Sequence, residues 1–278
     1  MKVLLTGAKG MLGTDVAKRL ETLGIDFRGV DIDELDISDD AVVSEFIAGY
    51  KPSAVIHCAA YTAVDKAENE PDLCMQVNAN GTENIARACC EAGAKMLYIS
   101  TDYVFDGKGE MSYEINAPKA PLSVYGKSKL AGEEAVLRHL KKYYIVRISW
   151  VFGQYGNNFV KTMLRLAETK DEINVVGDQI GSPTYTADLS ILLCDMIMSE
   201  KYGVYHATNE GFCSWAELAR EIMQINGNAC RIKSITTEQY PTKAVRPKNS
   251  RLSKISLDEA GFARLPEWKN ALKRYLNK

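Results

Sequence analysis

A glycine-rich turn close to the amino terminus constrains the fold more than any other feature of this sequence. The turn, Gly7-x-x-Gly10-x-x-Gly13, joins an apolar run at residues 2–5 to a pattern of helical period at residues 11–23. In a strand–turn–helix unit the first glycine permits a tight turn, the second lets the backbone approach a pyrophosphate, and the third lets the helix pack closely on the strand. The sequence therefore predicts a βαβ unit that binds a dinucleotide.

The same unit offers further contacts for a dinucleotide. The free N–H groups of Met11 and Leu12, at the start of the predicted helix, favour an anion together with the helix dipole. Asp31 ends the second predicted strand, where a carboxylate binds the hydroxyls of the adenosine ribose. A 2′-phosphate would be repelled there and no arginine follows, so Asp31 favours NADH over NADPH; a solvated loop aspartate is the alternative. Asp36 and Ile37 either contact adenine or only lead into the second helix.

The first 155 residues alternate short apolar segments with helical patterns. The predicted strands lie at residues 2–5, 27–30, 54–56, 96–100 and 145–148, and the predicted helices at residues 11–23, 39–49, 77–92 and 123–140. The strands are rich in Val, Ile and Leu without polar alternation, as expected where helices cover both faces of a parallel sheet. The pattern predicts an α/β fold: a Rossmann-like, doubly wound parallel sheet whose dinucleotide-binding domain spans residues 1–155.

The rhythm changes after residue 155. Helical patterns at residues 159–169, 186–199 and 215–224 alternate with short apolar segments at residues 173–176, 204–207 and 231–235. Ser214 and Glu217 have the spacing of a capping box, which marks the start of a helix. We expect residues 156–278 to form mainly a smaller C-terminal α/β substrate-binding lobe, with some segments returning to the first domain.

Composition narrows the class of protein. Hydrophobic residues make up 46% and charged residues 25% of the chain, and the net charge of −2 comes from scattered side chains. No basic cluster predicts a nucleic-acid partner, and no apolar segment is long enough to predict a membrane span. Seven cysteines, an odd number without a C-x-x-C pair, indicate reduced thiols. With no signal-peptide pattern at the start, we expect a cytoplasmic protein, for which a homodimer is one possible state.

A tyrosine and a lysine provide candidate acid–base chemistry. Tyr125 and Lys129 are four residues apart, so they share one face of the predicted helix. The pKa of a phenol lies near 10, and an adjacent ammonium lowers it toward the working range. The same lysine can hold the nicotinamide ribose. Thr101 follows the fourth predicted strand, at the sheet edge where active sites of parallel sheets form, so its hydroxyl can bond a carbonyl and Tyr125. An exposed tyrosine on a helix is the alternative.

These residues resemble those of the extended short-chain dehydrogenase/reductases. The glycine turn, Thr101 and the Tyr125/Lys129 pair carry that resemblance. Further stretches, spread over nearly the whole chain, are similar to the dTDP-4-dehydrorhamnose reductases: residues 58–68, 100–105, 124–132, 149–151, 156–163, 178–184 and 246–250. The resemblance implies hydride transfer from NAD(P)H to the C4 ketone of dTDP-4-dehydro-L-rhamnose, giving dTDP-L-rhamnose for polysaccharide synthesis.

The resemblance also implies roles for individual residues. Tyr125 would donate the proton, Thr101 would align it, and Lys129 would lower the pKa of Tyr125. The cofactor would be lined by Gly7, Gly10, Met11, Leu12, Gly13, Asp31, Asp36, Ile37, Ala60, Tyr61, Thr62, Tyr125 and Lys129. The residues that would contact the dTDP-ketosugar are Thr101, Asp102, Trp150 and Arg246. The Trp150 indole would pack against an apolar sugar face, and the Arg246 guanidinium would pair with the diphosphate. A core tryptophan and a surface arginine are the alternatives.

Two departures from the family pattern bear on these roles. Tyr61 stands where many relatives have histidine, which leaves the cofactor contact there to the backbone. Some members use Mg²⁺ at a subunit contact, but Glu267 is a lone carboxylate in this sequence, so we expect no metal.

Other functions on the same fold stay open. An NDP-sugar dehydratase needs Asp then Glu after the catalytic threonine, whereas Asp102 is followed by Tyr103 here. An epimerase would use much the same residues but would retain its cofactor. A non-catalytic regulatory subunit of methionine adenosyltransferase would bind the dinucleotide without turnover, and the intact Thr101, Tyr125 and Lys129 argue against it.

Overall fold

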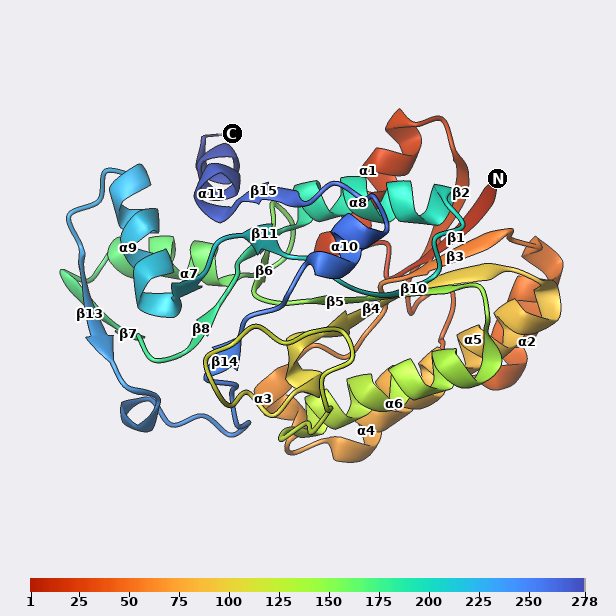
Figure 1. Ribbon diagram of the computed structural model, residues 1–278, viewed down its shortest axis with the longest axis horizontal. Helices are drawn as coiled ribbons and strands as arrows, with labels where there is room; N and C mark the ends of the chain where they lie inside the picture. The colour runs from red at the N-terminus through yellow and green to blue at the C-terminus, as the bar shows by residue number, and fades with distance from the viewer. Residues whose placement is uncertain (278) are drawn as a thin grey trace.

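The apolar strands of the first half assemble into one parallel sheet. The computed structural model describes residues 1–277, and its six-stranded sheet has the order β10-β5-β4-β3-β1-β2 (Figure 1). The strands are β1 (Lys2–Thr6), β2 (Asp26–Val30), β3 (Ala54–His57), β4 (Lys95–Thr101), β5 (Tyr143–Ile148) and β10 (Gly203–His206). All of their pairings are parallel. The predicted Rossmann-like sheet is therefore confirmed.

Helices cover both faces of this sheet (Figure 1). One face is covered by α1 (Met11–Thr22) and α8 (Thr186–Met198), and the other by α2 (Asp40–Tyr50), α5 (Gly81–Ala92) and α6 (Val124–His139). All four residues of β3 are buried, which explains its unbroken apolar sequence. The division of the chain at residue 155 stays a prediction, but two later elements, α8 and β10, lie with this first sheet.

The helix predicted over residues 77–92 begins differently. Two short helices, α3 (Val64–Ala67) and α4 (Pro71–Met75), precede a π-helical turn at Gln76–Asn80 that leads into α5. A π-helical turn accommodates an extra residue within a helix and often marks a functional site. The predicted start at residue 77 was wrong because helical structure already begins at Pro71, the first residue of α4. The sequence pattern did not show this, since neither a proline in the first turn nor the π-helical turn interrupts the helical periodicity.

The second lobe surrounds its own apolar core, on the left of Figure 1. It contains α7 (Phe159–Ala167), α9 (Trp215–Ile225) and α11 (Trp268–Leu276), whereas α10 (Ile255–Glu259) packs beside β10 on the core of the first sheet. Its short strands pair as β7 (Glu172–Val176) with β13 (Arg231–Ile235), β6 (Val151–Phe152) with β9 (Thr184–Tyr185), β11 (Asn209–Glu210) with β15 (Leu265–Glu267), and β8 (Ile180–Gly181) between β12 (Cys213–Ser214) and β14 (Asn249–Ser250). The predicted capping box of Ser214 and Glu217 is present at the start of α9.

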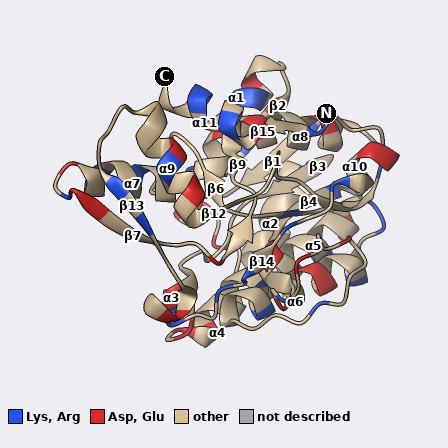
Figure 2. Cartoon of the chain, turned by 60° about the vertical axis from the view of Figure 1, so that its left-hand side comes forward, with Lys and Arg blue, Asp and Glu red and all other residues tan. Residues whose placement is uncertain are grey.

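Acidic and basic residues are interspersed along the helices, strands and loops (Figure 2). Among residues 1–277, no helix combines the length and apolar character needed to cross a bilayer. The same part of the chain contains no group of three His, Cys, Asp or Glu side chains placed to hold a metal ion. All seven cysteines are free thiols.

Candidate active site

A cavity of about 680 Å³ lies at the carboxyl ends of β1 to β5. Its wall combines the turn after β1, the ends of the other strands, the first turns of α6 and, from the second lobe, Asn157. All the predicted site residues except Arg246 line it: Gly7, Gly10, Met11, Leu12, Gly13, Asp31, Asp36, Ile37, Ala60, Tyr61, Thr62, Thr101, Asp102, Tyr125, Lys129 and Trp150. Residues separated by well over a hundred positions thus share one space.

The glycine turn has the geometry that the sequence predicts. Gly7 has a φ of 67°, and a Cβ on it would lie 2.6 Å from the backbone nitrogen of Ala59. A Cβ on Gly13 would overlap the carbonyl oxygen of Gly7, so only glycine lets α1 pack this closely on the turn. Gly10 precedes α1 without any side-chain cap, which leaves N–H groups of the first helical turn available to an anion.

Asp31 lines the cavity just after the end of β2. Its Oδ2 accepts a hydrogen bond from the backbone N–H of Lys9 at 3.1 Å, and its Oδ1 accepts one from Ile32 at 2.9 Å. The ammonium of Lys9 is 2.6 Å from Asp33 and 3.7 Å from Glu34. Sequence reasoning missed this cation because Lys9 occupies a variable position of the glycine motif.

Asp36 and Ile37 line the neighbouring wall but also have structural partners. Asp36 Oδ1 accepts hydrogen bonds from the backbone N–H of Ser38 at 2.9 Å and from its hydroxyl at 2.7 Å. Ile37 is buried, and a Cβ on Gly81 would lie 2.8 Å from its Cγ1. Both residues therefore help to form the entry to α2, and their contact with adenine stays a prediction.

The segment that includes Ala60, Tyr61 and Thr62 is held by Asn78. The Asn78 side chain accepts from the N–H of Tyr61 at 2.8 Å and donates to its C=O at 3.0 Å and to Ser128 Oγ at 2.9 Å. The phenol of Tyr61 donates to Glu70 at 2.7 Å. Because Asn78 already uses both backbone groups of Tyr61, a backbone contact with cofactor here would come from Ala60 or Thr62. Asn78 lies in the π-helical turn, and no motif in the sequence pointed to it.

Tyr125 is fixed by the amino terminus of α6. Ser123 caps this helix by accepting from Gly126 N–H at 3.0 Å, and Glu68 accepts from Val124 N–H at 2.8 Å. Burial raises the pKa of Tyr125, and the charge of Asp102 raises it further, whereas a hydrogen bond with Thr101 lowers it. The phenol is therefore protonated at neutral pH and can act as an acid.

Lys129 lies one turn further along α6 and is only 3% exposed. Burial lowers its pKa to about 7, against the attraction of the Glu133 carboxylate. Its ammonium lies 4.1 Å from the ring centroid of Tyr98. The net pKa of Tyr125 is raised and Lys129 is not among the groups that shift it, so the predicted lowering of the Tyr125 pKa by Lys129 stays a prediction.

Thr101 connects Tyr125 to a buried carboxylate. Its hydroxyl donates to Asp102 Oδ1 at 3.0 Å and accepts from the N–H of Tyr103 at 3.2 Å. Asp102 Oδ2 accepts from Ser250 Oγ at 2.5 Å. Burial raises the pKa of Asp102 to about 6, although these hydrogen bonds favour the charged form. Ser250, from β14, was not predicted as a site residue.

Trp150 and Arg246 lie at the side of the second lobe. Trp150 lines the cavity, and its ring stacks on Trp215 with centroids 3.7 Å apart. Arg246 lies outside the cavity wall and forms an ion pair with Asp65 at 2.6 Å, beside Tyr103. The predicted contacts of Trp150 with the sugar and of Arg246 with the diphosphate stay predictions.

Comparisons with known proteins extend over the whole chain. The family model described as RmlD substrate binding domain matches residues 1–278. The spore coat polysaccharide biosynthesis protein SpsK of Bacillus subtilis is 43% identical over 275 residues, covering 99% of this chain and 96% of that protein. A dTDP-4-dehydrorhamnose reductase of Aggregatibacter actinomycetemcomitans is 42% identical over 290 residues, covering 98% and 97%. The structure of a dTDP-4-dehydrorhamnose reductase of Bacillus anthracis in complex with NADP superimposes with a TM-score of 0.97 at 43% identity, covering 99% and 98%.

Proposed function

We propose a reaction for this chain on the premise that it belongs to the dTDP-4-dehydrorhamnose reductase family, whose resemblance was predicted from the sequence and is confirmed. The reaction is reduction of the C4 ketone of dTDP-4-dehydro-L-rhamnose to dTDP-L-rhamnose by a reduced nicotinamide dinucleotide. The observation that supports it most directly is that Thr101, Tyr125 and Lys129 line the same cavity as the glycine turn.

The residues present fit a nicotinamide dinucleotide. The uncapped start of α1 suits the pyrophosphate, the close packing at Gly7 and Gly13 leaves backbone at the cavity wall, and Asp31 suits ribose hydroxyls. When bound, the cofactor supplies the hydride. Lys129, whose pKa burial lowers to about 7, would donate a hydrogen bond to the nicotinamide ribose.

Tyr125 completes the reduction as general acid. The carbonyl carbon gains a hydride, and the carbonyl oxygen takes the phenolic proton of Tyr125, so the ketone becomes an alcohol. The raised pKa of Tyr125 suits this direction, because the proton is present when the oxygen gains charge. Thr101 orients the phenol through their shared hydrogen bond, and the phenolate regains a proton before the next turnover.

The test is a coupled assay of the purified protein. NADH should be oxidised only when the dTDP-ketosugar is supplied, and Tyr125→Phe should lower kcat by about 10²–10⁴-fold with little effect on NADH affinity. Tyr113→Phe is the matched control, because the Tyr113 phenol donates to Asp106 at 2.7 Å outside the cavity. Full activity of Tyr125→Phe would refute the assignment, and NADH binding without turnover would favour a regulatory subunit.

The preference between NADH and NADPH is a finer proposal. We favour NADH because the Asp31 carboxylate would repel a 2′-phosphate, although Lys9 adds a positive charge nearby. The ratio of kcat/KM for the two cofactors measures the preference, and Asp31→Asn should shift it toward NADPH. A ratio that does not change on this substitution would show that Asp31 does not select the cofactor.

We propose the cytoplasm as the place of this reaction, because a nucleotide sugar is a cytoplasmic metabolite in the family's reaction and the seven free thiols suit a reducing compartment. A homodimer stays a prediction, and sedimentation of the purified protein measures it. A dehydratase is less well supported, since Tyr103 stands where a glutamate base would be required and its pKa is raised by burial to about 12. An epimerase would retain its cofactor, so net oxidation of NADH in the coupled assay would exclude it.

A further inference from the structure

Trp150 has a backbone conformation that a bulky residue rarely adopts. Its φ is 50°, and within residues 1–277 only one other non-glycine residue, Lys51, has a positive φ. A left-handed conformation of a residue with a large side chain costs energy, and it persists where the surroundings determine it. Since Trp150 also lines the cavity, its surroundings show what fixes this part of the wall.

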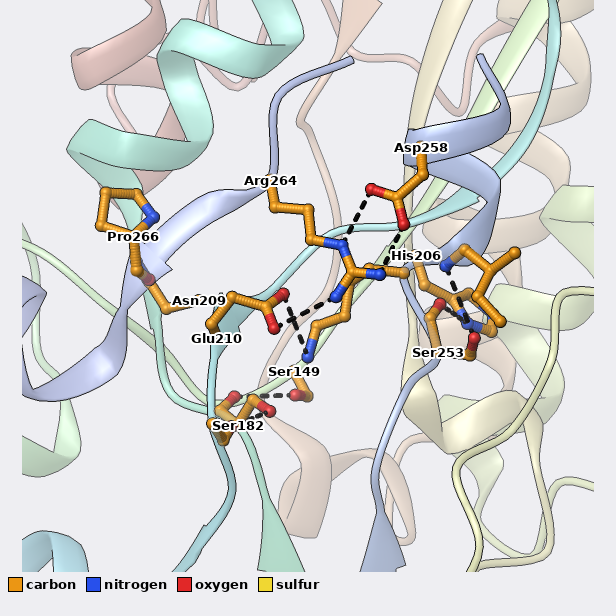
Figure 3. Close-up of polar contacts among 12 residues, drawn as sticks. Ser149, Ser182, His206, Asn209, Glu210, Ser253, Asp258, Arg264 and Pro266 are labelled. Carbon is orange, nitrogen blue, oxygen red and sulfur yellow. Dashed lines mark hydrogen bonds and ion pairs between the residues drawn. The ribbon is translucent and has the colours of Figure 1, made fainter. Parts of the chain in front are cut away.

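The backbone of Trp150 is fixed by the segment that follows β8. Ser149 Oγ donates to the carbonyl oxygen of Ser182 at 2.9 Å, a contact drawn in Figure 3. Thr184 donates from its hydroxyl to the carbonyl of Ser149 at 2.6 Å and from its N–H to the carbonyl of Trp150 at 3.1 Å. Three hydrogen bonds therefore hold the chain on both sides of the strained residue.

The ring of Trp150 is fixed by a second tryptophan. Trp215 stacks on it with centroids 3.7 Å apart and planes 13° apart, and Phe159 contacts Trp215 at 4.6 Å. Gly181 gives the ring room, since a Cβ there would lie 2.8 Å from Trp150 Cε2. Trp215 itself does not line the cavity, and its ring contacts the cavity wall through Trp150.

One small sheet connects the residues that hold Trp150 in the cavity wall. In the sheet β12-β8-β14, Cys213 and Ser250 both pair with Gly181. Ser214, the last residue of β12, caps α9, which begins with Trp215. Ser250 donates to Asp102, beside the catalytic Thr101. The sheet thus joins the tryptophan stack to the acid–base residues.

We propose that Trp215 is a positioning residue of the reductase: its indole holds Trp150 in the cavity wall and so sets the affinity of the sugar end for its substrate. This inference rests on the proposed function. It predicts that loss of the Trp215 ring weakens binding of the dTDP-sugar and leaves the dinucleotide end unchanged.

The stack has a spectroscopic signature that does not depend on catalysis. Two indoles in close parallel contact couple their transitions and give an exciton couplet in circular dichroism. The chain has three tryptophans, and the third, Trp268, is buried in the core of the second lobe. The wild-type protein should show the couplet, and Trp215→Leu should remove it while NADH binding stays close to wild type and the melting transition, although lowered by the lost packing, stays cooperative.

The kinetic test separates positioning from folding. In Trp215→Leu, KM for the dTDP-ketosugar and Kd for dTDP-L-rhamnose should rise about threefold to tenfold, in line with the strength of an aromatic pair, with KM for NADH unchanged. Trp215→Phe should restore much of the affinity without restoring the couplet. Phe212→Leu, a change at an exposed aromatic residue of the same lobe, should alter neither.

Two results would overturn the inference. One is a wild-type protein without the couplet, which would mean that the stack is absent. The other is a lost couplet in Trp215→Leu with unchanged KM and Kd for the sugar nucleotides, which would make the stack merely structural. A wild-type protein without turnover would instead refute the proposed function, and the Kd for dTDP-L-rhamnose would still judge the role of Trp215.

Discussion

Replacing Glu133 by glutamine removes a buried negative charge from α6, the helix that carries Tyr125 and Lys129. Glu133 and Arg147 are each 1% exposed, and they meet through two hydrogen bonds of 2.8 Å, from Arg147 Nε to Oε1 and from Nη2 to Oε2. Ser100 also donates to Glu133 at 2.5 Å. The other partners of Arg147 are the carbonyl of Ile115 at 2.8 Å and His206 at 3.2 Å. Neither supplies negative charge: the carbonyl is uncharged, and burial and the charge of Arg147 lower the pKa of His206 to about 3, so its ring is neutral.

The expected loss of unfolding free energy follows because Glu133 is the negatively charged partner of the buried Arg147. A glutamine keeps the shape of Glu133 but leaves the Arg147 cation buried without a counter-charge, which costs about 3–5 kcal/mol. A protein of this kind has a free energy of unfolding of about 5–15 kcal/mol, so the loss is a large share of the total. Burying the intact pair is itself expensive, so replacing both residues by apolar ones should recover most of the loss.

Urea denaturation measures the change as a difference in unfolding free energy. Glu83→Gln is the matched control, because Glu83 pairs with Arg138 at 2.6 Å on the surface, with side-chain exposures of 37% and 60%. That pair should contribute about 0–1 kcal/mol. The double variant Glu133→Leu/Arg147→Met should be more stable than Glu133→Gln. A loss in Glu133→Gln no larger than in Glu83→Gln would refute the reasoning.

Two further predictions concern the turn and the buried histidines. Gly13→Ala should weaken NADH binding about tenfold or more, because overlap with the backbone of the turn costs about 1–3 kcal/mol. Gly49→Ala is the control, because a Cβ on Gly49 would enter open space and should leave NADH binding unchanged. Equal NADH affinities of the two variants would contradict the packing argument. Burial holds the pKa of His57 and His206 at about 3 in the folded chain, against about 6.5 in the unfolded chain. Below about pH 6.5 the unfolded chain therefore binds more protons than the folded chain. Each histidine then lowers the free energy of unfolding by about 1.4 kcal/mol per pH unit down to about pH 3. Urea midpoints from pH 6.5 to 4 measure this, and a flat profile would exclude it.

Local patterns were sufficient to predict the first half of the fold. The strand, glycine turn and helix at the amino terminus depend on neighbouring residues, and each predicted strand of the first sheet is present. The pattern at residues 204–207 predicted a strand but could not name its partner. β10 pairs with β5 because the chain returns from the second lobe with α8, and that return depends on long-range packing.

The difference between local patterns and long-range packing also applies to the candidate site. Thr101, Tyr125 and Lys129 could be found because spacing within a helix and the end of a strand are visible in the sequence. Ser250 donates a hydrogen bond to Asp102 although the two residues are 148 positions apart in the sequence. Trp215 stacks on Trp150 because the small sheet β12-β8-β14 brings their segments together. No periodicity connects such residues, so only the folded chain identifies them.

The second lobe also controls the charge state of the site. Burial moves Tyr125, Lys129 and Asp102 toward their neutral forms, with pKa values of about 7 for Lys129 and about 6 for Asp102. Asp102 is covered in part by Ser250, which belongs to the second lobe. If the lobe moved away, water would reach this carboxyl group and its pKa would fall toward the ordinary value. The charge state of Asp102 therefore depends on the packing of both lobes, and not on the residues of the first domain alone.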